Sequence, residues 1–180
     1  MQTTLLTKED DIASAFNIPK GITALVGGGG KTTLMLRFSR ALSQSGSTVI
    51  ITTTTHIFPP EGIERYNPAN KEDAYKAFLR SNLVCFGKPA ENGKLSAPDL
   101  AMDTMESIAD YVIVESDGAK RLPLKAPAEH EPVIPNRAKL VIAVAGVDGV
   151  GQAIRKAAFR PALYTALLGK TQDDIGTAED

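Results

Sequence analysis

The chain has 180 residues, a mass of 19.1 kDa and a formal net charge of −1. Its 43% hydrophobic and 23% charged residues are ordinary globular values, which exclude collagen-like, disordered and membrane-spanning chains. Lys and Arg do not outnumber Asp and Glu, so we expect no nucleic-acid partner and no membrane partner. Because Cys85 is the single cysteine and the N-terminus does not resemble a signal peptide, we expect a cytoplasmic protein. Cys85 lies on a predicted buried strand, where we expect it to pack without a chemical role.

Helix-like and strand-like segments alternate along the chain. In chain order the patterns predict a helix at residues 7–16 with Thr7 as N-cap, a strand at 22–26, a helix at 31–45, a strand at 48–53, a helix at 71–80, a strand at 83–86, a helix at 98–109, buried strands at 111–115 and 140–145, and a helix at 161–168. The Asn92-Gly93 pair favours a small hairpin over 83–97. Residues 116–139 contain four prolines and little periodicity, which is typical of a functional or mobile loop.

The strand segments are apolar without alternation, as in a parallel sheet covered by helices on both faces. We therefore expect a three-layer α/β, P-loop NTPase-like fold that forms one domain over residues 1–180. Ligands of such sheets bind beyond the carboxyl ends of the strands, so we expect the motifs below to converge there.

A glycine-rich loop joins the first predicted strand to the second predicted helix. Glycines allow backbone N–H groups to approach phosphate oxygens, and the start of the helix adds its partial positive charge. In this pattern Lys31 would contact the β- and γ-phosphates and the Thr32 hydroxyl would bind Mg²⁺. The spacing G-x-x-G-K-T-T is shorter than the usual phosphate loop and resembles that of Mur-type ligases; the alternative is a glycine turn with an incidental lysine. The predicted nucleotide-binding residues are Gly27, Gly28, Gly29, Gly30, Lys31, Thr32 and Thr33.

Two carboxylates follow the strand at 111–115. A nucleotide site needs a carboxylate near Mg²⁺, normally at the end of a neighbouring apolar strand. We assign Glu115 to the metal, together with Thr32, and Asp117-Gly118 to a turn near the γ-phosphate. The two carboxylates remain partly interchangeable at this stage, and Asp117-Gly118 could be only a turn signal.

A threonine run ends the strand at 48–53. The hydroxyls of Thr53 and Thr54 could bind phosphate or metal, or the threonines could merely extend the strand. His56 could position the nucleophile or carry a proton, or it could be an ordinary surface residue.

The proline-rich loop concentrates charged side chains. Prolines limit its conformations, and Lys and Arg suit an anionic ligand or a transition-state charge, although a solvated surface loop would have a similar composition. The residues concerned are Lys120, Arg121, Lys125, His130 and Glu131.

The chain resembles the YqeC family of selenium-dependent hydroxylase accessory proteins. The resemblance rests on VGGGGKTT at 26–33, TTTTHI at 52–57, VESDGAKRLPLKAPAEHEPVIP at 114–135 and RPALYTALLG at 160–169. It implies a nucleotide-binding protein associated with the maturation of selenium-containing molybdenum hydroxylases, and it favours a functional role for the five loop residues. A molybdenum hydroxylase or one of its maturation proteins is therefore an expected partner. A homo-oligomer is a separate expectation, in which a sheet edge left uncovered by a missing C-terminal part pairs with another chain.

Two features concern the end of the chain. Thr177-Ala-Glu-Asp180 has the form of a capping box, which normally opens a helix, and family members generally continue further. We therefore expect a missing C-terminal part. The Asn-Lys-x-Asp motif by which P-loop GTPases bind the base is absent from the sequence, so ATP is only slightly favoured over GTP.

These observations favour an enzyme that cleaves or transfers the γ-phosphoryl group of ATP (or GTP) with Mg²⁺. In this hypothesis Lys31 neutralises the developing charge, Thr32 and Glu115 hold the metal, and Asp117 or His56 positions the nucleophile. The acceptor could be water, or a small molecule as in a kinase or ligase. The alternatives are a non-catalytic protein whose 116–139 loop moves with the nucleotide and contacts a partner, and a degenerate fold without nucleotide.

Overall fold

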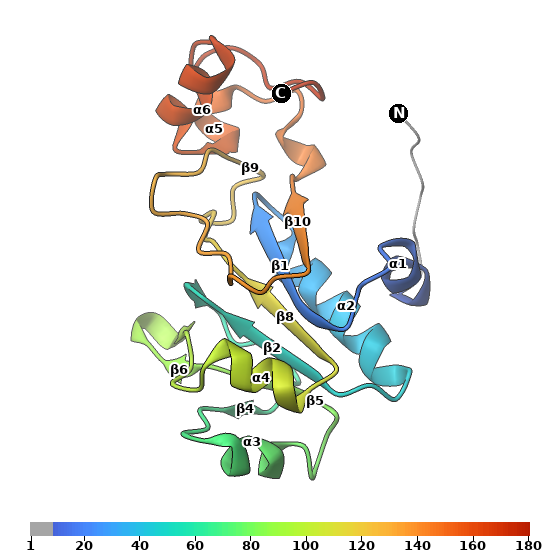
Figure 1. Ribbon diagram of the computed structural model, residues 1–180. Helices are drawn as coiled ribbons and strands as arrows, with labels where there is room; N and C mark the ends of the chain where they lie inside the picture. Colours follow the sequence, from blue (N-terminus) through green and yellow to red (C-terminus); the bar gives the residue numbers. More distant parts are fainter. Residues whose placement is uncertain (1–8) are drawn as a thin grey trace.

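The computed structural model describes residues 9–180, in which a six-stranded sheet is covered by helices (Figure 1). The order across the sheet is β10-β1-β8-β2-β5-β4, and every pairing is parallel. The strands are β1 (Gly21–Gly27), β2 (Val49–Thr53), β4 (Arg65–Tyr66), β5 (Leu83–Phe86), β8 (Tyr111–Glu115) and β10 (Leu140–Val144). Strands β1, β2 and β8 occupy the interior of the sheet because their residues are apolar or β-branched and almost all buried.

One face of the sheet packs against α1 (Glu9–Ala15) and α2 (Lys31–Gln44), and the other against α3 (Lys71–Ala77) and α4 (Met102–Ile108) (Figure 1). Phe38 of α2 is fully buried in the first core, and Met105 of α4 in the second. The fold is therefore the expected α/β arrangement with a mainly parallel sheet between helical layers. Cys85 is buried in the first core, as predicted, and burial raises the pKa of its thiol to about 12.

The segment after β10 forms a small separate core. It contains η2 (Val147–Gly149), α5 (Ile154–Ala157) and α6 (Pro161–Leu168), together with a two-stranded parallel sheet of β9 (Leu124–Lys125) and β11 (Ala158–Phe159). Leu124 and Ala126 of the proline-rich segment pack against Ile154 and Tyr164 in this core. The proline-rich segment thus joins the main sheet to the C-terminal helices.

Most predicted elements are confirmed, with shorter helices at 71–77 and 102–108 than expected. The predicted hairpin over 83–97 is wrong in extent, because β5 pairs in parallel with β2 and β4. Only β6 (Lys88–Pro89) and β7 (Leu95–Ser96), on either side of η1 (Glu91–Gly93), form a hairpin, and β7 also pairs with β3 (His56–Ile57).

Two other expectations need correction. Strand β10 is not a buried strand: it is the edge of the sheet, and Val141 is 44% exposed. The predicted Thr7 cap lies outside the described residues. At the other end, Asp180 accepts a hydrogen bond from the Thr177 N–H at 2.8 Å, the contact expected of a capping box. None of the described helices is long and apolar enough to cross a membrane.

Candidate functional site

The glycine loop lies at the carboxyl end of β1 and packs closely against two other segments. Gly27 and Gly30 have φ angles of 103° and 95°, which favour glycine. At Gly28 the constraint is space, since a Cβ would lie 1.9 Å from the carbonyl oxygen of Pro123. The glycines therefore allow the proline-rich segment to cross directly over the loop.

Most of the loop's own N–H groups already have protein acceptors. The Gly27 N–H donates to the Asp117 carboxylate at 2.9 Å, the Gly28 N–H to the Val144 carbonyl at 2.7 Å, and the Gly29 N–H to the Pro123 carbonyl at 3.1 Å. The first N–H groups of α2, by contrast, have no acceptor within the helix. The place for an anion is thus the N-terminus of α2, from Gly30 to Thr33, rather than the whole glycine loop.

Lys31 begins α2 and is buried, with 4% of its surface exposed. Its ammonium donates to the Gly27 carbonyl at 2.6 Å and to the Gly28 carbonyl at 3.3 Å, and it lies 3.1 Å from Asp117. These contacts hold the charge directly beneath the N-terminus of α2.

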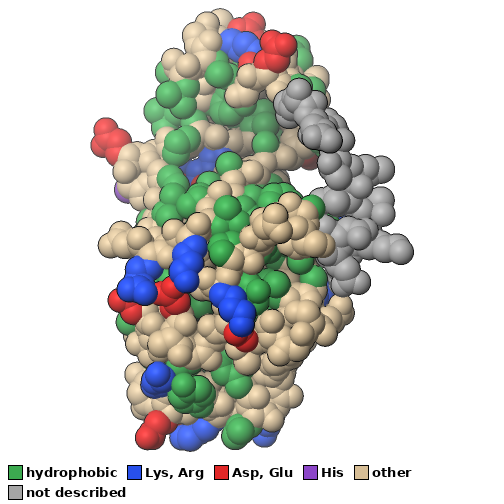
Figure 2. All heavy atoms as spheres, turned by 45° about the vertical axis from the view of Figure 1, so that its right-hand side comes forward, with side chains coloured by type: hydrophobic (Ala, Val, Ile, Leu, Met, Phe, Trp, Pro, Cys, Tyr) green, Lys and Arg blue, Asp and Glu red, His purple; other side chains and the backbone are tan. Residues whose placement is uncertain are grey.

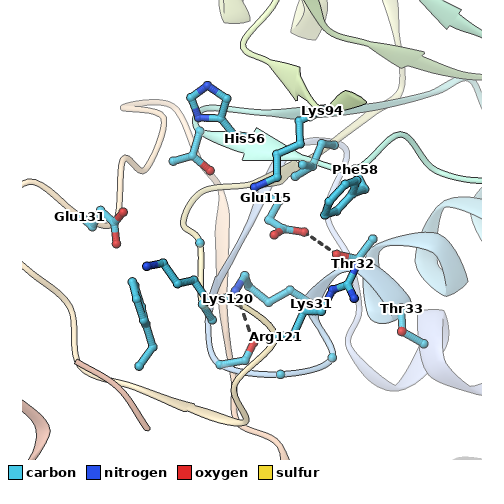
Figure 3. Close-up of a pocket in the computed structure, with 18 residues that line it drawn as sticks. Lys31, Thr32, Thr33, His56, Phe58, Lys94, Glu115, Lys120, Arg121 and Glu131 are labelled. Carbon is cyan, nitrogen blue, oxygen red and sulfur yellow. Dashed lines mark hydrogen bonds between the residues drawn. The ribbon is translucent and has the colours of Figure 1, made fainter. Parts of the chain in front are cut away.

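Glu115 ends β8, which is the strand next to β1. Its carboxylate accepts a hydrogen bond from the Thr32 hydroxyl at 2.9 Å (Figure 3). Burial raises the pKa of Glu115 above its usual value, against the lowering effect of Lys31 and of the Thr32 hydrogen bond. A hydroxyl and a carboxylate in contact are oxygen ligands of the kind that Mg²⁺ uses, so these two residues fit the predicted metal site. The described residues contain no group of three or more His, Cys, Asp and Glu side chains that could hold a metal by themselves.

Asp117 lies beneath the cavity and does not belong to its wall. It is 2% exposed and contacts the ammonium groups of both Lys31 and Lys125, the latter at 2.9 Å. Lys125 also pairs with Glu131 at 2.6 Å, and Glu131 pairs with Arg160 at 3.0 Å. Burial opposes the ionisation of Glu131, but the hydrogen bonds from Lys125 and Arg160 outweigh it and hold its pKa below the usual value. A series of ion pairs thus connects the glycine loop to Arg160, the N-cap residue of α6.

The threonine run holds the site together. The Thr53 hydroxyl donates to the Glu115 carbonyl at 2.8 Å and accepts from the Thr55 N–H, and the Thr54 hydroxyl donates to the Val133 carbonyl at 2.7 Å. Thr53 and Thr54 therefore support β8 and the proline-rich segment and lie outside the cavity wall. His56 is exposed, stands at the margin of the site and is part of the wall (Figure 3).

The proline-rich segment turns at Lys120-Arg121, three residues after the predicted pair Asp117-Gly118. The turn runs from Ala119 to Leu122, whose N–H donates to the Ala119 carbonyl at 2.8 Å, and Lys120 and Arg121 are its central residues. Both side chains are part of the cavity wall, whereas His130 is exposed elsewhere. Of the five loop residues, Lys120, Arg121 and Glu131 reach the cavity, and Lys125 supports Glu131 from below.

These elements enclose a cavity of about 480 Å³ at the carboxyl edge of the sheet, a size suited to a small-molecule ligand. Figure 3 shows Lys31, Thr32 and Glu115 near its centre. Its wall is formed by Gly28, Gly29, Gly30, Lys31, Thr32, Thr33, Thr55, His56, Ile57, Phe58, Lys94, Glu115, Gly118, Ala119, Lys120, Arg121, Glu131 and Phe159.

Sequence reasoning missed several residues of the cavity wall, Phe58, Lys94 and Phe159 among them, and also Arg160, which contacts the wall residue Glu131. The Asn92-Gly93 signal predicted a turn, but it could not show that the turn would bring Lys94 over the glycine loop. Arg160 begins the RPALYTALLG block that contributed to the family resemblance, but it had no assigned role, and its contact with Glu131 depends on the fold of the C-terminal segment.

Comparison with known proteins gives a consistent result. The sequence model of the YqeC protein family matches residues 23–162. The chain is 37% identical over 139 residues to the "Uncharacterized protein YqeC" of Escherichia coli (strain K12), covering 72% of this chain and 53% of that protein. The chain thus spans about half the length of this curated relative. No solved structure matches. The family match covers the glycine loop, the acidic strand end and the proline-rich segment together, and the chain therefore belongs to the YqeC family.

Proposed function

We propose that the chain binds and hydrolyses a nucleoside triphosphate, ATP or GTP, with Mg²⁺. The observation that carries this proposal is the contact between Thr32, at the start of the helix that follows the glycine loop, and Glu115, at the end of the adjacent strand. The contact brings the expected phosphate-binding and metal-binding groups into one cavity. Neighbouring strands of a parallel sheet end at the same edge, which accounts for the convergence.

The residues of the chain divide the work in this proposal. The N–H groups at the start of α2 and the Lys31 ammonium bind the β- and γ-phosphates and neutralise charge that develops on the γ-phosphoryl group. Thr32 and Glu115 would hold Mg²⁺, which when bound supplies further charge neutralisation. Asp117 positions Lys31 through their contact at 3.1 Å, and His56 remains the candidate for positioning the attacking water.

The family resemblance supports a more specific role as a nucleotide-dependent accessory factor for molybdenum hydroxylases that carry selenium. The 116–139 segment is the candidate contact with such a partner, because it forms part of the cavity wall and also packs against the C-terminal helices. In this role a change of the bound nucleotide alters the contacts of Lys31. The change passes to the 116–139 segment through the ion pairs that connect Lys31, Asp117, Lys125 and Glu131.

The first test is phosphate release from ATP and from GTP with Mg²⁺, for the wild type and for Lys31→Ala. Removal of a preorganised charge-stabilising group typically costs about 10²–10³ in rate, and we expect at least that loss. Lys71→Ala is the matched control, because Lys71 is an exposed lysine at the start of α3, away from the cavity. Equal turnover by wild type and Lys31→Ala would overturn the assignment.

The same assay with and without a molybdenum-hydroxylase apoenzyme tests the accessory role. Turnover that rises on addition of the apoenzyme supports it. Nucleotide binding without turnover in both conditions would favour a switch that does not hydrolyse the nucleotide.

A further inference from the structure

The turn at Ala119–Leu122 holds two basic residues in a strained conformation. Lys120 and Arg121 have φ angles of 47° and 64°, in the left-handed region. Turns with positive φ at both central residues favour Asn and Gly, so a Lys-Arg pair is unfavourable for the backbone alone. The surroundings maintain the turn, since the Pro123 carbonyl that follows it accepts hydrogen bonds from Gly29 and Gly146. The strained turn carries both cations into the cavity wall.

A third cation comes from a distant part of the chain. Lys94 follows η1 in the small hairpin, and its ammonium lies 5.2 Å from the centre of the Phe58 ring. The guanidinium of Arg121 lies 5.3 Å from the centre of the same ring, and the ammonium of Lys120 lies 5.4 Å from that of Phe159. We refer to Lys94, Lys120 and Arg121 as the cationic rim; all three belong to the cavity wall, and Figure 3 shows their side chains on different sides of it.

The cationic rim is not neutralised by acidic side chains. Within residues 9–180, Lys94, Lys120 and Arg121 have aromatic contacts but no ion pair with a described carboxylate. Some other cations of the described residues are paired, as Lys20 is with Asp110 at 2.8 Å, and Figure 2 shows Lys and Arg side chains both beside and apart from Asp and Glu.

The two carboxylates of the cavity wall have their contacts with residues outside the cationic rim. Glu115 accepts from Thr32, and Glu131 is held by Lys125 and Arg160. Like charges that share a partly enclosed space repel one another, and an anion placed among them relieves that repulsion.

The cationic rim is also distinct from the phosphate site at the start of α2. It is built by the hairpin and the Ala119–Leu122 turn, whereas Lys31 is held against the glycine loop by Gly27 and Asp117. The aromatic rings of Phe58 and Phe159 add apolar surface to the same wall, and Phe58 is 49% exposed. The cavity therefore offers an anion site at the helix N-terminus and a second, aromatic-lined anion site.

We propose that the cationic rim binds the carboxylate or phosphate group of a second small molecule, which occupies the cavity together with the nucleotide. This proposal rests on the proposed nucleotide site and extends it, because the cavity would then bind two ligands at once, the nucleotide and a second small molecule. Arg121 and the two lysines bind the oxyanion group, and Phe58 and Phe159 contact the body of the ligand.

The test measures binding of inorganic phosphate, and separately of malonate, to protein saturated with Mg²⁺ and the non-hydrolysable analogue AMPPNP. Calorimetry at constant ionic strength compares the wild type with the triple variant Lys94→Gln, Lys120→Gln and Arg121→Gln. The control variant is Arg40→Gln, Lys71→Gln and Lys156→Gln, which makes the same charge change at exposed positions outside the cavity. Circular dichroism verifies that each variant is folded.

We expect at least one of the two anions to bind the AMPPNP-loaded wild type and the control variant, and to bind the triple variant at least tenfold more weakly. AMPPNP affinity should change less than threefold in the triple variant. The proposal is overturned if neither anion binds the loaded protein, or if the triple variant loses AMPPNP affinity as strongly as anion affinity, since the cations would then belong to the nucleotide site.

Failure of the proposed nucleotide function has a different signature, in which AMPPNP does not bind the wild type at all. Phosphate and malonate are then titrated into the protein alone. Binding that survives Lys31→Ala but is lost in the triple variant supports the cationic rim, and binding that is unaffected by the triple variant refutes it.

Discussion

The two ends of strand β8 carry carboxylates in opposite circumstances. Asp110 lies just before the strand and accepts hydrogen bonds from Lys20 at 2.8 Å and from the N–H and hydroxyl of Thr48, each at 3.0 Å. These contacts, that of Lys20 first, lower the pKa of Asp110 to about 2. Glu115 ends the strand, is 7% exposed and accepts from one hydroxyl, and burial raises its pKa. The carboxylate at the amino edge is fully satisfied, whereas the one at the carboxyl edge has acceptor capacity left for a ligand.

The glycines at the two ends of β1 show the same contrast. A Cβ on Gly21, at the amino edge, would meet the flexible ends of the Glu106 and Lys139 side chains at 2.9 Å. A Cβ on Gly28, at the carboxyl edge, would meet the backbone of Pro123 at 1.9 Å. At the amino edge of the sheet, side-chain ends can move to accommodate an added atom. At the carboxyl edge the backbone of Pro123 lies against the glycine loop and leaves no space for one.

The largest expected effect comes from adding a methyl group at the packed edge. Gly28→Ala should destabilise the fold by about 3 kcal/mol, at the upper end of overpacking effects, because neither backbone can move away easily. Gly21→Ala should cost about 1 kcal/mol, chiefly for its φ of 106°. Urea unfolding of both variants measures the difference. Equal losses would show that the contact between the glycine loop and Pro123 is loose.

The second prediction separates binding from stability at the carboxyl edge. Glu115→Gln keeps the shape and removes the charge, so Mg²⁺-dependent AMPPNP affinity should fall at least tenfold, or about 1.4 kcal/mol. Stability should not fall, since the variant no longer buries an ionisable group whose burial disfavours its charge. Calorimetry with and without Mg²⁺, together with urea unfolding, measures both quantities.

The matching variant at the amino edge is Asp110→Asn. It should leave Mg²⁺-dependent AMPPNP affinity unchanged and lower stability. If Glu115→Gln keeps its nucleotide affinity, the metal role of Glu115 is wrong. The two carboxylates would then differ only in how deeply they are buried.

The sequence was sufficient to predict the main parallel sheet and the convergence of Lys31, Thr32 and Glu115. Those predictions depend on local patterns, because a few adjacent residues are enough to identify an apolar strand, a glycine loop or the start of a helix. The edge position of β10 and the parallel pairing of β5 could not be predicted, because they depend on which strands become neighbours.

The contributions of Lys94, Phe58 and Arg160 were beyond sequence reasoning for a related reason. Each enters the site through a contact between segments far apart in the chain, such as that of Arg160 with Glu131. Asp117 shows the converse limit. Its place after the strand predicted a catalytic neighbourhood, but its burial between Lys31 and Lys125 depends on how the proline-rich segment folds back.

The smallest effect concerns Asp110 and its dependence on pH. Because the pKa of this carboxyl is about 2 in the folded chain and 3.8 for an unperturbed aspartate, the folded state favours the charged form. Its stabilising contribution is therefore complete above about pH 4 and is lost as the pH falls toward 2. The side chain is 33% exposed, so solvent screening reduces the contribution to about 1 kcal/mol. Wild type and Asp110→Asn should differ by that amount in urea unfolding at pH 7, and the difference should shrink as the pH is lowered from 4 to 2. A difference that stays constant over this range would mean that Asp110 acts through the shape of its contacts with Thr48 and not through its charge.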